Sequence, residues 1–311
     1  MPRPDQAPRF AAIVGATGTG KSGFALDLAD ELARRGRTAE VVNADAMQLY
    51  QGMDIGTAKL LPGERRGIPH HLFDVLEVTD EASVEWYQRR ARDVVDEILG
   101  REAIPLLVGG SGLYVSGVVF DFRFPGTDPE VRRRYEQLLD DGGSRALYDL
   151  LHDRDPAAAV AIGRFNGRRL VRALEVGEIT GEPFAVGLPD DAPLWRPVSL
   201  IGLDEERAVL VDRLDRRVEA MWSAGLVSEV EHLLPLGLDR GVTASRAIGY
   251  AQAIGQVRGL LGEEEAQDAT KQLTRRYARR QVSWFKRYPR VAWSRSGDPT
   301  AVSAAADTLL G

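Results

Sequence analysis

A glycine-rich loop between an apolar run and an amphipathic segment constrains the fold of this chain most strongly. The loop, GATGTGKS at residues 15–22, matches the pattern GxxxxGK[ST]. Residues 10–15 have the apolar character of a buried parallel strand, and residues 21–35 carry apolar side chains at helical spacing before Gly36. Strand, loop and helix in this order predict a phosphate-binding P-loop, because glycines let backbone amides turn toward phosphate oxygens.

Each position of the loop is a candidate contact to the phosphates. Lys21 would neutralise a terminal phosphate, and the Ser22 hydroxyl would bind Mg²⁺. By itself the loop suggests ATP or GTP and does not identify the phosphate compound. The predicted phosphate-binding residues are Gly15, Ala16, Thr17, Gly18, Thr19, Gly20, Lys21 and Ser22.

Strand and helix patterns alternate along the first part of the chain. Residues 39–43 predict a second strand and the apolar run 104–108 a third, and between them Ser83 is an expected N-cap of a helix that ends near residue 99. This alternation predicts an α/β fold of P-loop type, a parallel sheet with helices on both faces. The loops that follow the strands then meet at one edge of the sheet, where such folds bind ligands.

The composition changes after residue 121, and this change predicts a second domain. Residues 122–197 read as helices between two Pro- and Gly-containing connectors, and residues 198–203 resume the strand pattern. With 311 residues the chain is long enough for a large domain and a smaller one. We therefore expect a catalytic core formed by residues 1–121 and 198–311, with a mainly helical insertion at 122–197.

The charge is acidic overall but unevenly distributed. The net charge is −6, yet residues 271–290 contain no acidic residue and eight lysines or arginines. A second acid-free stretch carries Arg164, Arg168, Arg169 and Arg172. Solvated helix faces paired to acids elsewhere would explain either stretch, whereas the two together favour a polyanionic partner.

Several classes of protein are excluded or disfavoured by composition. The chain has no cysteine, which excludes disulfides, thiolate zinc sites and a cysteine nucleophile. No apolar run approaches the roughly 18 residues that span a bilayer, and residues 1–9 lack the apolar core of a signal peptide. We expect a cytoplasmic protein without a membrane partner.

Two polar residues follow strands at the predicted binding edge. Asp45 could bind metal through water, act as a general base, or simply form a turn. Ser111, in the glycine-rich turn after residues 104–108, could hydrogen-bond substrate or cap the next helix. That run ends in Gly-Gly-Ser and lacks the Walker-B aspartate, which counts against a standard ATPase or GTPase.

Two further groups are expected to be structural. His70 and His71 are adjacent, lack helical ligand spacing and have no cysteine nearby, so we favour a structural role over a metal site. Trp284, Phe285, Tyr288 and Trp293 interleave with the basic stretch. Base stacking is one reading of these aromatics, and packing of a helix onto the core is the favoured one.

Taken together, these motifs resemble the tRNA dimethylallyltransferase family, in its bacterial form. The resemblance covers nearly the whole chain and is not limited to the P-loop. The matching runs are 43–50 (NADAMQLY), 52–59 (GMDIGTAK), 70–72 (HHL), 107–114 (LVGGSGLY), 128–132 (DPEVR), 168–175 (RRLVRALE), 247–250 (AIGY) and 275–281 (RRYARRQ). The absence of cysteine leaves no zinc finger of the kind that eukaryotic relatives often add.

The resemblance implies transfer of a dimethylallyl group from its diphosphate to N6 of the adenosine just 3′ of the anticodon. It implies that Asp45 is the base, that Ser111 bonds at the reacting centre and that Arg217 contacts the diphosphate. The target adenine would be flipped out of its stack, and the insertion would clasp the anticodon stem-loop. The implied tRNA-binding residues are Asp45, Ala46, Met47, Gln48, Ser111, Arg132, Arg168, Arg169 and Arg172.

The implied partners are tRNA, dimethylallyl diphosphate and Mg²⁺, and we expect the chain to act as a monomer. Three alternatives stay open at this point. An adenylate dimethylallyltransferase would need no RNA-gripping insertion, and a small-molecule kinase would phosphorylate with ATP. A non-catalytic nucleic-acid-binding module would have no use for intact Lys21, Ser22, Asp45 and Ser111.

Overall fold

The computed structural model describes residues 10–121, 124–184, 193–288 and 290–311. The N-terminal segment expected to lack a signal peptide, and parts of both expected connectors, lie outside these residues. The chain divides into two compact units. The first comprises Met1–Asp121 and Pro193–Gly311, and the second comprises Phe122–Ala192.

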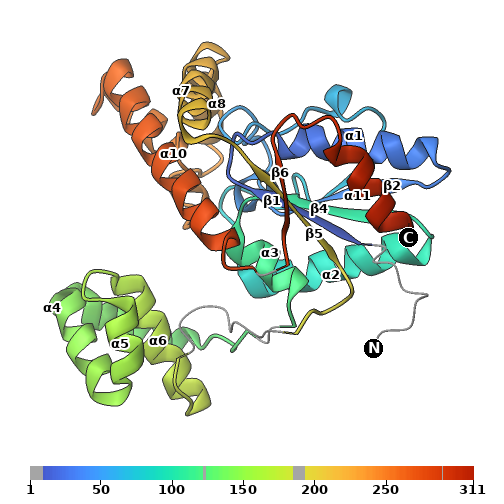
Figure 1. The fold of residues 1–311 in the computed structure, drawn as a ribbon. Coiled ribbons are helices and arrows are strands. Elements are labelled where there is room, and N and C mark those ends of the chain that lie inside the picture. Colours follow the sequence, from blue (N-terminus) through green and yellow to red (C-terminus); the bar gives the residue numbers. More distant parts are fainter. Residues whose placement is uncertain (1–9, 122–123, 185–192, 289) are drawn as a thin grey trace. The chain divides into compact units, whose positions relative to one another are not determined.

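The first unit is built on one parallel sheet (Figure 1). Its central strand is flanked by strands from distant parts of the sequence, which brings the loops after them to the same edge. In spatial order the strands are β3 (His70–His71), β2 (Ala39–Asn43), β4 (Ile104–Gly109), β1 (Ala11–Gly15), β5 (Ser199–Asp204) and β6 (Ala292–Arg295).

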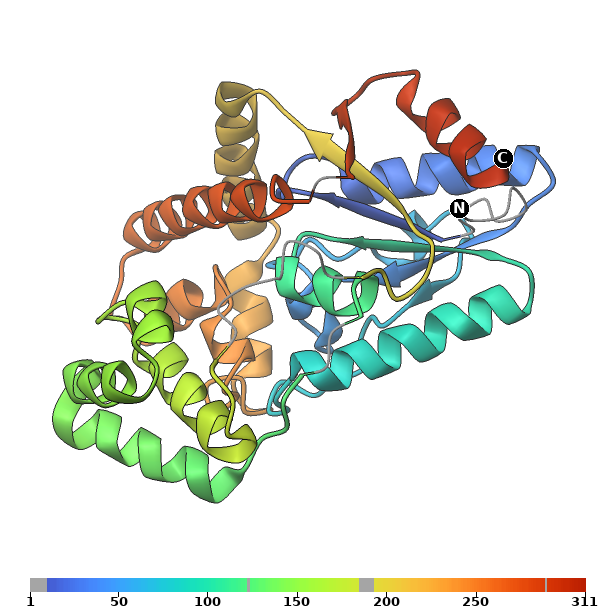
Figure 2. The ribbon, with the colours of Figure 1, turned by 60° about the horizontal axis from the view of Figure 1, so that its bottom comes forward.

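Helices cover both faces of the sheet, as the alternating pattern predicts (Figure 2). On one face α1 (Lys21–Arg34) and α11 (Ala301–Leu310) pack against the strands through a buried aliphatic core. The opposite face carries α2 (Val84–Gly100) and α3 (Gly112–Val119). Because β1 and β4 are buried along their whole length, their sequences are almost entirely apolar, whereas the equally buried β2 contains Glu40 and Asn43.

A second hydrophobic core lies among the later helices of this unit. Its buried side chains come from the segments around Tyr50 and Val78 and from four helical elements that follow β5. Those elements are α7 (Arg207–Ser223), α8 (Leu226–Leu233), α9 (Tyr250–Val257) and α10 (Glu263–Phe285). The single-turn helices are η1 (Ala46–Leu49), η2 (Pro62–Glu64) and η3 (Ala244–Arg246).

Two strands differ from the sequence-based expectation. His70 and His71 form β3, which pairs with Val41 and Val42, and the His71 Nε2 lies 2.6 Å from Glu40 Oε2. His70 Nδ1 also lies 2.8 Å from the Ile68 carbonyl oxygen, so both histidines contact neighbouring parts of the fold. β6 was missed because its four residues are mostly exposed at the sheet edge and have no apolar run to mark them.

The second unit consists of α4 (Pro129–Arg154), α5 (Pro156–Ile162) and α6 (Gly167–Thr180) around their own small core. Within it the fully buried carboxylate of Glu175 receives Arg132 Nη2 at 3.0 Å and Arg172 Nη1 at 2.8 Å. The Arg132 pair joins α4 to α6, whereas the Arg172 pair lies within α6.

The chain rejoins the first unit at Pro193 rather than at the expected residue 198. Phe120 forms an antiparallel bridge with Leu194, and the Trp195 amide donates to the Val119 carbonyl at 2.9 Å. The segments that leave and re-enter the first unit are thus joined by backbone hydrogen bonds before β5 begins. No helix in the described part of the chain is long and apolar enough to cross a bilayer.

Candidate active site

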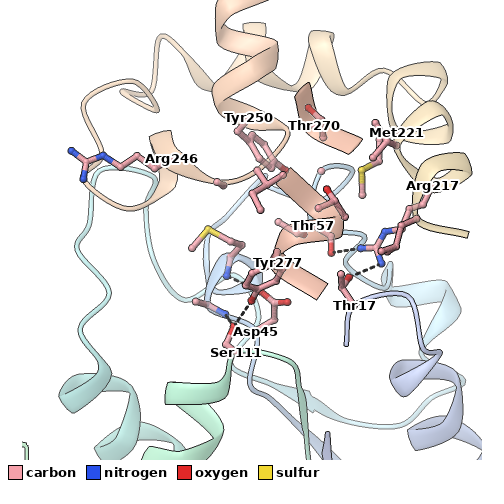
Figure 3. A pocket seen from close by; sticks show the side chains of 18 of the residues that line it. Thr17, Asp45, Thr57, Ser111, Arg217, Met221, Arg246, Tyr250, Thr270 and Tyr277 are labelled. Atoms are coloured by element: carbon pink, nitrogen blue, oxygen red, sulfur yellow. Dashed lines mark hydrogen bonds between the residues drawn. The ribbon is translucent and has the colours of Figure 1, made fainter. Parts of the chain in front are cut away.

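The loops after β1, β2 and β4 meet, as predicted, at one cavity of about 270 Å³ (Figure 3). Thr17 comes from the P-loop, Asp45 follows β2 and Ser111 follows β4. The remaining wall is supplied by α7, by the segment 246–250 and by α10. The cavity therefore joins the sheet edge to the second hydrophobic core of the same unit.

The P-loop has the backbone that its glycines predict. Gly15 has a φ of 148°, and a Cβ there would lie 2.5 Å from the carbonyl oxygen of Leu203 on the neighbouring strand. Only glycine fits such an approach. The loop then turns directly into α1, whose N-terminal amides add positive potential at the cavity.

Two cations stand beside this loop. Lys21 Nζ donates to the Ala16 carbonyl at 2.7 Å, and Arg217 reaches from α7 to Thr17 Oγ1 at 3.2 Å and to the Thr57 carbonyl at 3.3 Å. Burial lowers the pKa of both side chains, while the negative charge of Asp45 opposes that shift. Two partly desolvated cations beside a phosphate-type loop are arranged for an anionic ligand that carries more than one charge.

The lowered pKa of Lys21 predicts a pH limit on the free enzyme. Burial brings this pKa to about 8, with Arg217 adding to the shift and Asp45 opposing it. As the pH rises through 8, Lys21 loses its charge and the anionic ligand is bound less well. We expect kcat/KM for a diphosphate substrate to fall above about pH 8, which steady-state profiles between pH 6 and 10 can measure.

The matched variant for this pH limit is Lys21→Arg, because a guanidinium stays charged over the whole range. In this variant kcat/KM should no longer fall on the alkaline side of the pH profile, even if its overall activity is lower. A wild-type profile that stays flat to pH 10 would contradict the assignment of that limb to Lys21.

Asp45 has both a turn-forming and a free oxygen. It is the N-cap of η1, where its Oδ1 accepts from the Met47 amide at 3.0 Å, and its own amide donates to Asn43 Oδ1 at 2.8 Å. The Oδ2 atom has no hydrogen-bond partner among the described residues. Asp45 can therefore form the turn with Oδ1 and act as a base with Oδ2, so the two interpretations are compatible.

Ser111 occupies the N-cap position of α3, but its side chain makes no capping bond. Its Oγ instead accepts from the Ala46 amide at 3.2 Å and lies 3.4 Å from the hydroxyl of Tyr277. Burial, and secondarily the charge of Asp45, raise the pKa of Tyr277 to about 12, so this phenol stays protonated. Ser111 thus ties the loop of Asp45 to α10.

Gln281 on α10 links two loops of the site and was given no role from the sequence. Its Oε1 accepts from the Thr17 amide of the P-loop, and its Nε2 donates to the Gly110 carbonyl, both at 2.8 Å. A Cβ on Gly110 would lie 2.3 Å from Nε2, so this approach requires glycine. Gln281 is the last residue of the motif 275–281, but only the tertiary structure identifies its contacts.

Replacing Gln281 by Met is expected to loosen both loops at once. The side chain is 4% exposed, so the Thr17 amide and the Gly110 carbonyl would be left buried and unpaired, at a cost of about 1–3 kcal/mol each. We expect a lower midpoint of thermal unfolding and roughly tenfold weaker use of the donor substrate.

Gln281→Glu separates the two bonds, because it can still accept from Thr17 but no longer donates to Gly110. Gln272→Met, at an exposed position of the same helix, is the matched control. Unchanged stability and unchanged KM in Gln281→Met would show that the two loops are held by other contacts.

Glu229 on α8 supports the wall that carries Thr57. Its carboxylate accepts from the amides of Asp54 at 3.2 Å and Ile55 at 2.8 Å, and also from the Tyr250 hydroxyl. Burial, and next the charge of Glu229, raise the pKa of Tyr250 well above its usual range. This residue was also missed, since no pattern around position 229 distinguishes it from a surface glutamate.

The residues predicted to bind tRNA fall into two groups. Ala46 and Met47 line the cavity beside Asp45 and Ser111, while Gln48 Nε2 donates to the Thr57 carbonyl at 3.1 Å. The predicted arginines belong to the second unit. Arg132 and Arg172 are paired with Glu175, whereas Arg168 and Arg169 are exposed.

Two cations of the basic stretch 271–290 pair with carboxylates of α7, and six others are exposed without an ion pair among the described residues. Lys271 pairs with Glu219 at 2.7 Å and Arg275 Nε pairs with Asp215 at 2.7 Å, which fastens α10 to α7. Arg280 lines the cavity.

The aromatics of the same stretch confirm the packing interpretation. Phe285 and Tyr288 are buried, and Trp284 Nε1 donates to Ser116 Oγ at 3.1 Å. Of the four expected aromatics only Trp293 lies on β6, where it is partly exposed.

Two oxygen donors of the kind that a hard divalent cation takes occur in the P-loop and after β2, although Ser22 is exposed and is not among the residues that line the cavity. Ser22 lies in the first turn of α1 with no side-chain partner in the described ranges, and Asp45 offers a free carboxylate oxygen. A hydroxyl, a carboxylate and the oxygens of a bound phosphate are the ligands that Mg²⁺ prefers.

Comparison with known proteins gives a consistent result. Residues 48–288 match the sequence model of the family described as IPP transferase. The tRNA dimethylallyltransferase of Clavibacter sepedonicus is 57% identical over 300 residues, covering 96% of this chain and 97% of that protein. The tRNA dimethylallyltransferase of Leifsonia xyli subsp. xyli is 60% identical over 259 residues, covering 83% of this chain and 98% of that protein.

Solved structures agree with the sequence relatives. The full-length tRNA isopentenylpyrophosphate transferase from Bacillus halodurans aligns with a TM-score of 0.69 at 37% identity, covering 97% of this chain and 95% of that one. A eukaryotic dimethylallyltransferase acting on tRNA aligns with a TM-score of 0.74 at 24% identity, covering 93% of this chain and 74% of that one. The latter shows a likeness of fold.

Proposed function

This chain belongs to the IPP transferase family of tRNA dimethylallyltransferases, and we propose that it prenylates the adenosine 3′-adjacent to the anticodon in tRNA. The dimethylallyl group would pass from dimethylallyl diphosphate to N6 of that adenosine, with diphosphate released. The observation that carries the proposal is the meeting of the P-loop, Asp45 and Ser111 at one cavity that lacks a Walker-B aspartate.

The diphosphate of the donor is proposed to lie on the P-loop. Amides of the P-loop other than that of Thr17, which donates to Gln281, would stabilise its negative charge together with Lys21 and Arg217 as the bond between C1 and oxygen breaks. The apolar side chains of Leu214, Val218 and Met221 line the same cavity and suit the allylic chain. Diphosphate is then the leaving group, and no phosphoryl group is transferred.

The acceptor amine is proposed to be activated by Asp45. The exocyclic amine of adenine is a poor nucleophile, and the free Oδ2 can take its proton as the N6–C1 bond forms. Ser111, with its hydroxyl next to the Ala46 amide, would orient the reacting base. Since the base must leave its stack to reach the cavity, we propose a flipped adenosine, bordered by Ala46 and Met47.

Ser22 is the proposed protein ligand of Mg²⁺. The ion supplies positive charge that stabilises the leaving diphosphate. The chain's own residues bind and orient the two substrates.

The second unit is proposed to grip the anticodon stem-loop. Arg168 and Arg169 are exposed and suited to phosphates, and Arg132 and Arg172 lie at the adjoining carboxylate of Glu175. We further propose that the chain acts as a monomer in the cytoplasm. A free-nucleotide prenyltransferase would not need this unit, which favours tRNA over adenylate.

One experiment separates the candidate functions. The protein is incubated with Mg²⁺, dimethylallyl diphosphate and unmodified tRNA. The tRNA is then digested and its nucleosides are identified by mass spectrometry. A prenylated adenosine next to the anticodon is expected. Prenylation of AMP alone, or phosphorylation of a metabolite with ATP, would overturn the proposal in favour of the adenylate enzyme or the kinase.

A further inference from the structure

The turn between α5 and α6 presents a phenylalanine to solvent. Phe165 is 97% exposed, although its ring is large and apolar. The turn is fixed at both ends, because Gly163 ends α5 with a φ of 79° and Asn166 caps α6 through its side-chain oxygen. The exposed ring is therefore held on a short, defined turn between two helices.

Close to Phe165 in the sequence lie three arginines that pair with no carboxylate among the described residues. Arg164, Arg168 and Arg169 are exposed, and none forms an ion pair within the described part of the chain. In the same unit Arg132 and Arg172 both form ion pairs with the buried Glu175. Arg164, Arg168 and Arg169 form no such pair in the described ranges. Arg164 lies over the ring of Tyr148, with Cζ 5.3 Å from the ring centre.

The position of Arg168 and Arg169 is electrostatically unfavourable without a ligand. Both lie in the first turn of α6, where the partial positive charge of the helix end repels cations, and that turn contains no acidic residue. A bound anion would relieve this repulsion. The surface thus combines an aromatic face with exposed cations.

We propose that Phe165 is a stacking platform for an unpaired base of the substrate RNA, with Arg168 and Arg169 holding the flanking phosphates. An unpaired nucleotide offers both a π face and a phosphate, whereas the bases of a duplex are not free to stack. A protein partner would need a broader apolar patch than one ring among like charges. This inference rests on the proposed function, since it takes tRNA as the substrate.

Substitutions of Phe165 test the platform through affinity for unmodified tRNA. Phe165→Leu keeps apolar bulk but removes the π face, and we expect about five- to hundredfold weaker binding. Phe165→Trp should bind at least as tightly as wild type. The decrease of affinity in Phe165→Leu should appear in the dissociation constant and in KM for tRNA, because the effect lies in substrate binding. Val160→Ala, at a 68% exposed apolar position on α5, is the control and should bind as wild type.

Salt dependence separates the platform from the cationic residues. Arg168→Gln with Arg169→Gln should lower the slope of log affinity against log salt by roughly 0.7–0.9 for each phosphate that these arginines neutralise. Phe165→Leu should leave that slope unchanged. A 2-aminopurine placed in turn at each anticodon-loop position should be quenched at one position by wild type and less by Phe165→Leu.

The outcomes are distinguishable. Wild-type affinity of Phe165→Leu for tRNA, or a decrease of affinity in Phe165→Trp equal to that in Phe165→Leu, would overturn the platform while prenylation by the wild type stands. If Phe165→Leu alters self-association but not tRNA binding, the ring serves a protein contact and the proposal is wrong. If the wild type does not prenylate tRNA, the proposed function itself fails.

Discussion

Asp45→Asn is expected to slow dimethylallyl transfer by about two to four orders of magnitude while tRNA binding survives. The amide oxygen of Asn can still accept from the Met47 amide, so the N-cap of η1 and the shape of the loop are retained. What disappears is the ability to take a proton from the acceptor amine. Single-turnover rates, measured beside the dissociation constant for tRNA, check both halves of this expectation.

Asp307→Asn, an exposed position on α11, is the matched control and should have wild-type rates. A second readout is specific to the charge of Asp45. Because that charge raises the pKa of Lys21, its removal should shift the alkaline limb of the pH profile to lower pH. Equal decreases of tRNA binding and rate would instead make Asp45 a positioning residue.

Lys21→Met is expected to lower kcat by roughly two to three orders of magnitude, the cost of removing one preorganised stabiliser of developing negative charge. Met has similar length and no charge, and the Ala16 carbonyl that loses the Lys21 bond still accepts from Thr19 Oγ1 at 2.9 Å, so the P-loop backbone should be retained. The effect should appear in kcat because charge on the leaving diphosphate grows as its bond to carbon breaks. Steady-state kinetics with saturating tRNA and varied dimethylallyl diphosphate provide the measurement.

Lys286→Met, at an exposed position just after α10, makes the same chemical change away from the cavity and should be neutral. If Lys21→Met raised only KM for the diphosphate, with kcat unchanged, Lys21 would bind the ground state and the transition state equally. That result would transfer the leaving-group role to Arg217 and the loop amides.

The sequence by itself determined the features that depend on short stretches of chain. The strand before Gly15, the helix after Lys21 and the Ser83 cap all occur where local patterns place them. The P-loop pattern also fixed the backbone of the loop, because few residues other than glycine tolerate such φ values or such close approaches. The meeting of Asp45 and Ser111 followed from a general rule about the edges of parallel sheets.

Only the tertiary structure decided which distant groups hold that edge together. Gln281 reaches the P-loop across 264 positions, and Ser111 bonds the loop of Asp45 instead of capping its own helix. The sequence did not distinguish the roles of the four arginines predicted to bind tRNA. In the structure Arg132 and Arg172 form ion pairs with the buried Glu175, whereas Arg168 and Arg169 are exposed. The physical reason is that periodicity and capping record interactions between near neighbours in the chain. A hydrogen bond between residues that are remote in the chain leaves no such pattern, and it exists only once packing has removed the competing water.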